Sequence, residues 1–182
     1  MRRFLLLLIM LILVNLTVFA EDGEVFYAQA WQEGIQKYND ISINNRTCPI
    51  EIIGFYRPSK KHAHCISGIF MGKTSSDQPI LSFEVRVVTL DAGLNPLVTL
   101  STTEAIRLVG KQYYGSPVYN WYLAPDDMEN YFMTVTYIAE VKMRGRVWRC
   151  DTRSLVEFLK RIDITCSERD LEPTVSSPER EK

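Results

Sequence analysis

Two histidines and four cysteines are among the side chains of this sequence whose types suit metal binding or nucleophilic catalysis. His62 and His64 are one residue apart, so on a strand both imidazole rings would lie on one face, as a metal site requires. The sequence contains no third histidine, however, and Lys60 and Lys61 would repel a cation. We therefore expect a solvated loop, with no metal and no cofactor.

Catalytic motifs are equally sparse. A serine or cysteine nucleophile needs a base within hydrogen-bond reach, but both histidines lie in one charged loop, and no Gly-x-Ser-x-Gly elbow is present. Asp126, Asp127 and Glu129 could act as paired carboxylates, although their turn-like setting is more typical of solvated residues. We expect a protein that is not an enzyme, with a small secreted hydrolase as the less favoured alternative.

The cysteines are better explained as disulfide partners. An even number of cysteines in a secreted chain indicates disulfides, and the spacing favours two local pairs, Cys48 with Cys65 and Cys150 with Cys166. Each pair would close a loop of about 17 residues and contribute about 3 kcal/mol. Pairing between the two halves of the chain is the alternative.

The N-terminus is typical of a secretory signal peptide. Arg2 and Arg3 precede the apolar run Phe4 to Val14, and we expect cleavage after Ala20. A membrane anchor is the alternative, but Asn15 and Thr17 interrupt the apolar stretch and no basic stop-transfer sequence follows it. No second apolar run approaches 18 residues, so no stable span is expected in the mature chain. We expect a secreted, extracellular protein with a signal peptide at 1–20, a single domain at 21–166 and a disordered polar tail at 167–182.

Charge and glycosylation fit that location. The 182 residues carry a net charge of −1, which becomes −3 when the two leader arginines are removed, so a general nucleic-acid binder is not expected. Asn45-Arg46-Thr47 forms an N-glycosylation sequon, and we predict that Asn45 is glycosylated.

Helix-like and strand-like periodicities alternate along the mature chain. Helices are expected over residues 24–39, from the spacing of apolar residues, over residues 101–110, from a Ser-Thr-Thr-Glu capping box, and over residues 151–162, with Asp151 as N-cap. Strands are expected over residues 50–56, 65–71, 81–90, 131–143 and 147–150. The prediction is an α+β fold: an N-terminal helix packed on an antiparallel sheet, with additional short helices and stabilisation by disulfides.

Two surfaces are candidates for binding. The basic loop between the first two strands contains Arg57, Lys60, Lys61, His62 and His64, and extracellular basic loops can bind acidic polysaccharides or acidic proteins. Lys142, Arg144, Arg146 and Arg149 form a similar cluster. An aromatic stretch is either a contact surface or core: Tyr113, Tyr114, Tyr119, Trp121 and Tyr122.

The expected helix ending at Lys37-Tyr38-Asn39, followed by antiparallel strands, resembles the opening of a cystatin-like domain over residues 24–90. That family inserts a Gln-x-Val-x-Gly loop into the cleft of cysteine proteases. His64-Cys65-Ile66-Ser67-Gly68 occupies the comparable place here, with only an aliphatic third residue and the final glycine matching. Trp148 is similar to the tryptophan of the family's second loop, but the proline before it is absent. The resemblance implies cysteine-protease inhibition as an alternative function.

The sequence therefore predicts a secreted, disulfide-bonded glycoprotein that acts as a non-catalytic extracellular binding module. Its partner would be an extracellular protein or an acidic polysaccharide.

Overall fold

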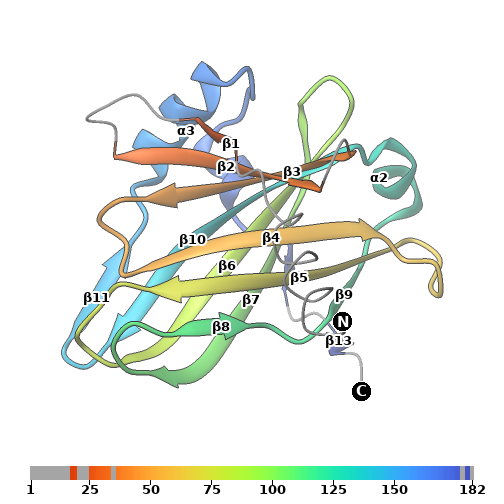
Figure 1. Ribbon diagram of the computed structural model, residues 1–182. Helices are drawn as coiled ribbons and strands as arrows, with labels where there is room; N and C mark the ends of the chain where they lie inside the picture. The colour runs from red at the N-terminus through yellow and green to blue at the C-terminus, as the bar shows by residue number, and fades with distance from the viewer. Residues whose placement is uncertain (1–16, 20–24, 34–35, 177–178, 181–182) are drawn as a thin grey trace, which may run out of the picture.

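Two β-sheets make up most of the protein. The structure is a computed structural model that describes residues 17–19, 25–33, 36–176 and 179–180 (Figure 1). The larger sheet has the order β1 (Thr17–Phe19), β2 (Phe26–Glu33), β3 (Gln36–Asn45), β10 (Met133–Met143), β6 (Ile80–Leu90), β7 (Pro96–Leu108) and β12 (Val175–Ser176), with β11 (Arg146–Arg149) paired to β10. The smaller sheet has the order β13 (Glu179–Arg180), β9 (Tyr119–Tyr122), β5 (Cys65–Thr74) and β4 (Ile50–Pro58), with β8 (Tyr113–Gly115) paired to β5.

Two hydrophobic cores give the protein three layers. The first lies between the sheets and contains Ile52 and Phe70 of the smaller sheet with Phe83 and Val85 of the larger one. The second lies on the other face of the larger sheet, where helix α3 (Thr152–Arg161) and the 3-10 helix η1 (Glu168–Leu171) cover it. The short helix α2 (Pro125–Asn130) leads into β10. The larger sheet is therefore the middle layer, as Figure 1 shows.

The predicted α+β fold with an N-terminal helix is wrong. The segment expected to form that helix, residues 24–39, instead contains β2 and the start of β3. These strands pair antiparallel, Ala28 lies opposite Ile43, and both side chains are buried in the second core. Most of the helix expected over residues 101–110 is instead the second half of β7, which pairs with β6 and whose β-branched residues suit a strand. Tertiary pairing overrides the local helical signals in both places.

Other elements follow the sequence pattern closely. β4, β5, β6, β10 and β11 confirm the five predicted strands. Helix α3 is confirmed, and its N-cap Asp151 accepts a hydrogen bond from the amide of Ser154 at 3.2 Å. The predicted leader at 1–20 lies outside the described residues except for Thr17–Phe19, which pair with β2.

Side chains, rather than a backbone ladder, join β3 to β4. Asp40, Ser42 and Asn44, at alternate positions on β3, accept hydrogen bonds from the backbone amides of Tyr56, Gly54 and Ile52, respectively. The three distances are 2.9, 2.9 and 2.7 Å. We call this contact the β3–β4 seam. It lets the chain pass from the larger sheet to the smaller one while the buried amides of β4 keep partners.

Two glycines make room for a buried tyrosine at this seam. The Tyr56 ring packs where Gly54 and Gly68 lack side chains: a Cβ atom at Gly68 would lie 2.1 Å from Tyr56 Cδ1, and one at Gly54 would lie 2.5 Å from Tyr56 Cε2. Tyr56 and Gly68 are opposite each other in the β4–β5 pair. The glycines therefore decide where this aromatic ring lies.

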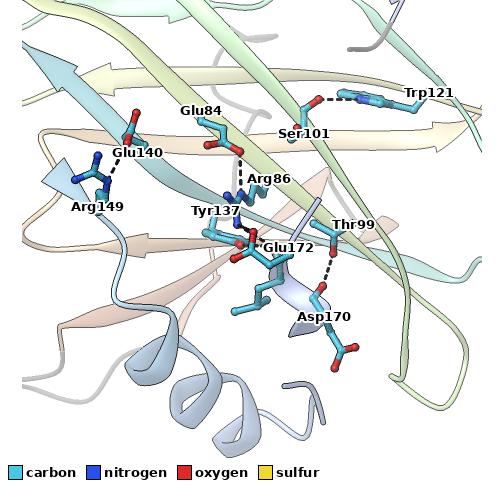
Figure 2. Close-up of polar contacts among 11 residues, drawn as sticks. Glu84, Arg86, Thr99, Ser101, Trp121, Tyr137, Glu140, Arg149, Asp170 and Glu172 are labelled. Carbon is cyan, nitrogen blue, oxygen red and sulfur yellow. Dashed lines mark hydrogen bonds and ion pairs between the residues drawn. The ribbon is translucent and has the colours of Figure 1, made fainter. Parts of the chain in front are cut away.

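The chain after α3 is held against the larger sheet (Figure 2). Arg86 Nη1 and the Tyr137 hydroxyl both donate to the carbonyl oxygen of Leu171, at 2.9 and 3.0 Å, and Arg86 Nε donates to Glu84 at 2.8 Å. The Thr99 hydroxyl donates to the carbonyl of Asp170 at 2.5 Å. Leu171 is 0% exposed, so this part of the segment expected to be a disordered tail packs against the sheet.

Candidate functional site

The five residues of the predicted basic loop lie together at one end of the smaller sheet. Arg57 is near the end of β4, Lys60, Lys61 and His62 occupy the connection, and His64 immediately precedes β5. All five are exposed. We call this segment, residues 57–64, the basic loop.

Hydrogen bonds fix the conformation of the basic loop. The Ser59 amide donates to the carbonyl of Cys65 at 2.8 Å, and the Ser59 hydroxyl accepts from the amides of Lys61 and His62, both at 3.2 Å. The carbonyl of His64 accepts from the amide of Leu123 at 2.8 Å. His64 has a φ of 52°, a left-handed conformation that is uncommon for a residue other than glycine. The loop is a constrained turn rather than a loose connection.

An aromatic side chain lies beside these cations. The ring of His62 meets that of Tyr122 edge to face, with centroids 6.1 Å apart. Tyr122 is 45% exposed, whereas its neighbours Tyr119 and Trp121 are buried in the core between the sheets. The core interpretation therefore holds for Tyr119 and Trp121, whereas Tyr122 is an accessible ring next to the basic loop and its use as a contact stays a prediction.

Ion pairs with described residues involve two of the four cations of the second basic cluster, Lys142 and Arg149, but not Arg57 or Lys60 of the basic loop. In the second cluster, Lys142 and Arg149 share the carboxylate of Glu140, at 3.2 and 2.9 Å. The β10–β11 hairpin and the basic loop lie at opposite ends of the molecule (Figure 1), so they do not form one surface.

The candidate carboxylates lie on α2, which begins two residues after Leu123. Asp126, Asp127 and Glu129 make no ion pair with a described residue. Neither histidine side chain hydrogen-bonds to a described serine or cysteine. Within the described ranges, no group of three or more His, Cys, Asp or Glu side chains is arranged to hold a metal ion.

No helix in the described part of the chain is long and apolar enough to cross a membrane.

The predicted disulfides are wrong: the structure has no disulfide among its described residues. Cys48 precedes the start of β4, but Cys65 begins β5 beside the end of β4, because Ile50 pairs with Thr74 and Pro58 with Ile66. At about 3.3 Å per residue, the intervening strand separates the two cysteines by roughly 26 Å. Cys150 and Cys166 both contact the second core without bonding to each other.

The predicted glycosylation site lies at the end of β3. Asn45 is 8% exposed, and its Oδ1 accepts from the amide and the hydroxyl of Thr47 at 2.8 and 2.7 Å. Arg46 and Thr47 are exposed. Glycosylation of Asn45 stays a prediction.

The segment that the cystatin resemblance places in a protease cleft is mostly strand. Residues 65–68 lie in β5 between β4 and β9, paired on both sides, and only His64 belongs to the connecting turn. Comparison with protein-family models, with curated proteins and with solved structures gave no match.

One buried acid was missed from the sequence. Asp40 lies between the expected helix over residues 24–39 and the first expected strand over residues 50–56, where the sequence predicts no element, yet it is 4% exposed at the β3–β4 seam. The strict alternation Asp40-Ile41-Ser42-Ile43-Asn44 was the signal that could have shown a strand. Burial raises the pKa of Asp40 from 3.8 to about 6, although hydrogen bonds from Thr134 and from the Tyr56 amide oppose that rise.

Proposed function

We propose that this protein is a non-catalytic extracellular binding module that contacts an acidic polysaccharide through the basic loop. The observation that carries the proposal is the concentration of five exposed basic residues within eight positions of one constrained turn. A signal peptide, as expected from the sequence, would deliver the protein to the compartment where such polymers occur.

The arrangement of charge supports an anionic ligand. Arg57 and Lys60 have no described carboxylate to neutralise them, so a bound sulfate or carboxylate group would meet their full charge. A fixed turn also reduces the conformational entropy lost on binding.

The aromatic neighbour favours a sugar polymer over a simple anion. The exposed ring of Tyr122 offers an apolar face beside the cations, held against His62. A sulfated sugar presents both charged groups and an apolar ring face, so it can use both features. An acidic protein surface is the other outcome that the experiment must separate.

A matched pair of variants tests the proposal. Lys60→Gln/Lys61→Gln removes two charges from the basic loop, and Arg144→Gln/Arg146→Gln removes two charges from the hairpin at the opposite end. On immobilised heparin, the loop variant should elute at clearly lower salt than the wild type, and the hairpin variant should stay close to it. Equal losses would show that net charge alone governs retention, and failure of the wild type to bind heparin would refute the polysaccharide.

A third variant should change heparin binding in the opposite direction. α2 follows closely on Leu123, which is bonded to the basic loop, so Asp126→Asn/Asp127→Asn removes negative charge near the ligand. Binding to heparin should strengthen in this variant if the polymer lies on the basic loop. The absence of inhibition of papain-like proteases by the same preparations would separate this function from the one that the cystatin resemblance implies.

A further inference from the structure

Asp40 connects the two sheets through neutral groups only. Its Oδ2 accepts from the backbone amide of Tyr56 on β4 at 2.9 Å, and its Oδ1 accepts from the hydroxyl of Thr134 on β10 at 2.6 Å. The residue is 4% exposed, and no described cation forms an ion pair with it. An ionised carboxylate in this place lacks both water and a counter-charge, which is unfavourable.

The groups facing Asp40 keep a constant charge over the physiological range. β10 contributes Thr134 and Thr136, which do not titrate, and β4 contributes Tyr56. Tyr131, between α2 and β10, also interacts electrostatically with Asp40. Burial raises the pKa of both tyrosines well above its usual value, so both remain neutral. Among the described residues, Asp40 is therefore the group of this cluster that changes charge near neutral pH.

The neutral carboxyl can keep both contacts. A hydroxyl can donate or accept, so a protonated Oδ1 can donate to Thr134 while Oδ2 still accepts from Tyr56. The hydroxyl of Tyr56, which interacts electrostatically with Asp40, is buried and lies beside the hydroxyl of Thr136, so this acid has uncharged polar neighbours. Asp40, the member of this buried polar cluster that titrates near neutral pH, is therefore better accommodated uncharged.

We propose that Asp40 is a proton-controlled fastener between the two sheets: proton uptake in mildly acidic medium strengthens the β3–β4 seam, and proton loss at neutral pH weakens it. The amide of Tyr56 donates to Asp40, and Tyr56 directly precedes Arg57, so the fastener lies next to the first residue of the basic loop. The proposal does not depend on what the basic loop binds.

The sign follows from linkage. Because the pKa of Asp40 is higher in the folded protein, about 6 against 3.8, the folded state binds more protons between these values, and stability falls as pH rises through them. Between pH 5.0 and 7.5, a shift of this size changes the unfolding equilibrium constant about tenfold, in favour of the unfolded state at pH 7.5.

Urea denaturation at pH 5.0 and 7.5 tests this for the wild type, Asp40→Asn and the exposed control Asp126→Asn. Between pH 5.0 and pH 7.5, the unfolding equilibrium constant of the wild type and of the control should each increase about tenfold more than that of Asp40→Asn. Parallel pH responses of the wild type and Asp40→Asn would overturn the proposal.

A direct measurement covers the case in which Asp40→Asn does not fold. The carboxyl carbon resonance of Asp40 in the wild type, followed by NMR, should titrate near pH 6, and in Thr134→Val at higher pH, because a hydrogen bond to the ionised form is lost. Titration of the wild-type carboxyl near pH 4 would refute the fastener.

Discussion

The side chain of Asn44 supplies the main chain of Ile52 with both hydrogen bonds that a neighbouring strand would normally provide. Asn44 Oδ1 accepts from the Ile52 amide at 2.7 Å, and Asn44 Nδ2 donates to the Ile52 carbonyl at 2.9 Å. The side-chain amide of Asn44 therefore takes the place of a backbone peptide group of a neighbouring strand. Nδ2 also donates to Gln29 Oε1 at 3.0 Å, which links the seam to β2.

Replacing Asn44 by alanine should leave two buried backbone groups of β4 without partners. We expect a loss of about 2–4 kcal/mol in the free energy of unfolding, measured by urea denaturation. Asn130→Ala is the matched control, because Asn130 is exposed and donates one hydrogen bond, to Asp126. Similar losses of unfolding free energy in the two variants would show that the hydrogen bonds of Asn44 do not stabilise the β3–β4 seam.

Gly68→Ala should destabilise the protein because the new methyl group would overlap the Tyr56 ring. We expect a cost of about 1–3 kcal/mol or more, the range typical of overpacked cores. Gly115→Ala is the control: a Cβ there meets nothing within 4 Å, and the unfolding midpoint should stay nearly constant.

A double variant checks the cause. Gly68→Ala/Tyr56→Ala should lose less stability than the sum of its single variants, because the clash is then absent. If the stability losses of the two single variants simply add in the double variant, the methyl group at residue 68 does not clash with the Tyr56 ring.

Arg86→Ala should release the segment around η1 from the larger sheet. The change removes a donor to the Leu171 carbonyl and leaves Glu84, which is largely buried, without its partner. Trypsin cleavage after Arg169, followed by mass spectrometry, should become faster than in the wild type, with Tyr137→Phe showing a smaller increase. Arg146→Ala, at an exposed position, should leave cleavage unchanged, and an unchanged rate in Arg86→Ala would contradict the role of this contact.

The thiols of Cys150 and Cys166 should react slowly in the folded protein. Burial raises the pKa of Cys150 to about 12 and that of Cys166 to about 11, so little thiolate is present at pH 8. Iodoacetamide should alkylate both much faster in denaturant than in native buffer, as read by peptide mass spectrometry. Equal rates in the two conditions would contradict the burial of these side chains.

The sequence predicted strands well where one face is apolar and the other polar. β6 and β10 alternate in that way over most of their length, and their positions agree with the period-two pattern. β3 differs because its polar residues point into the protein, where the backbone of β4 is their partner. The alternation from Asp40 to Asn44 indicates a strand, but it does not indicate that the polar face is the buried one, because the backbone groups of β4 that bond this face leave no signal in the residues of β3.

The candidate site was partly predictable for the same reason. Arg57 and His64 flank a polar connection between two apolar strands, which indicates an exposed hairpin from sequence alone. That Tyr122 stands beside His62 depends on the pairing of β9 with β5, in which Cys65 is opposite Tyr122. The residues of that pair are 57 positions apart, and nothing near either one signals the contact.

The parallel pairing of β3 with β10 sets the order in which the chain can fold. Asp40 and Thr134 are 94 residues apart, so β3 has only β2 beside it, and lacks β10, until most of the chain has been synthesised. Contacts of such long range slow folding, and strands that wait for a partner are prone to aggregate. Ribosome-bound fragments that end before β10 should therefore hold β2 and β3 in a form that chaperones recognise, and release from chaperones should coincide with the emergence of β10.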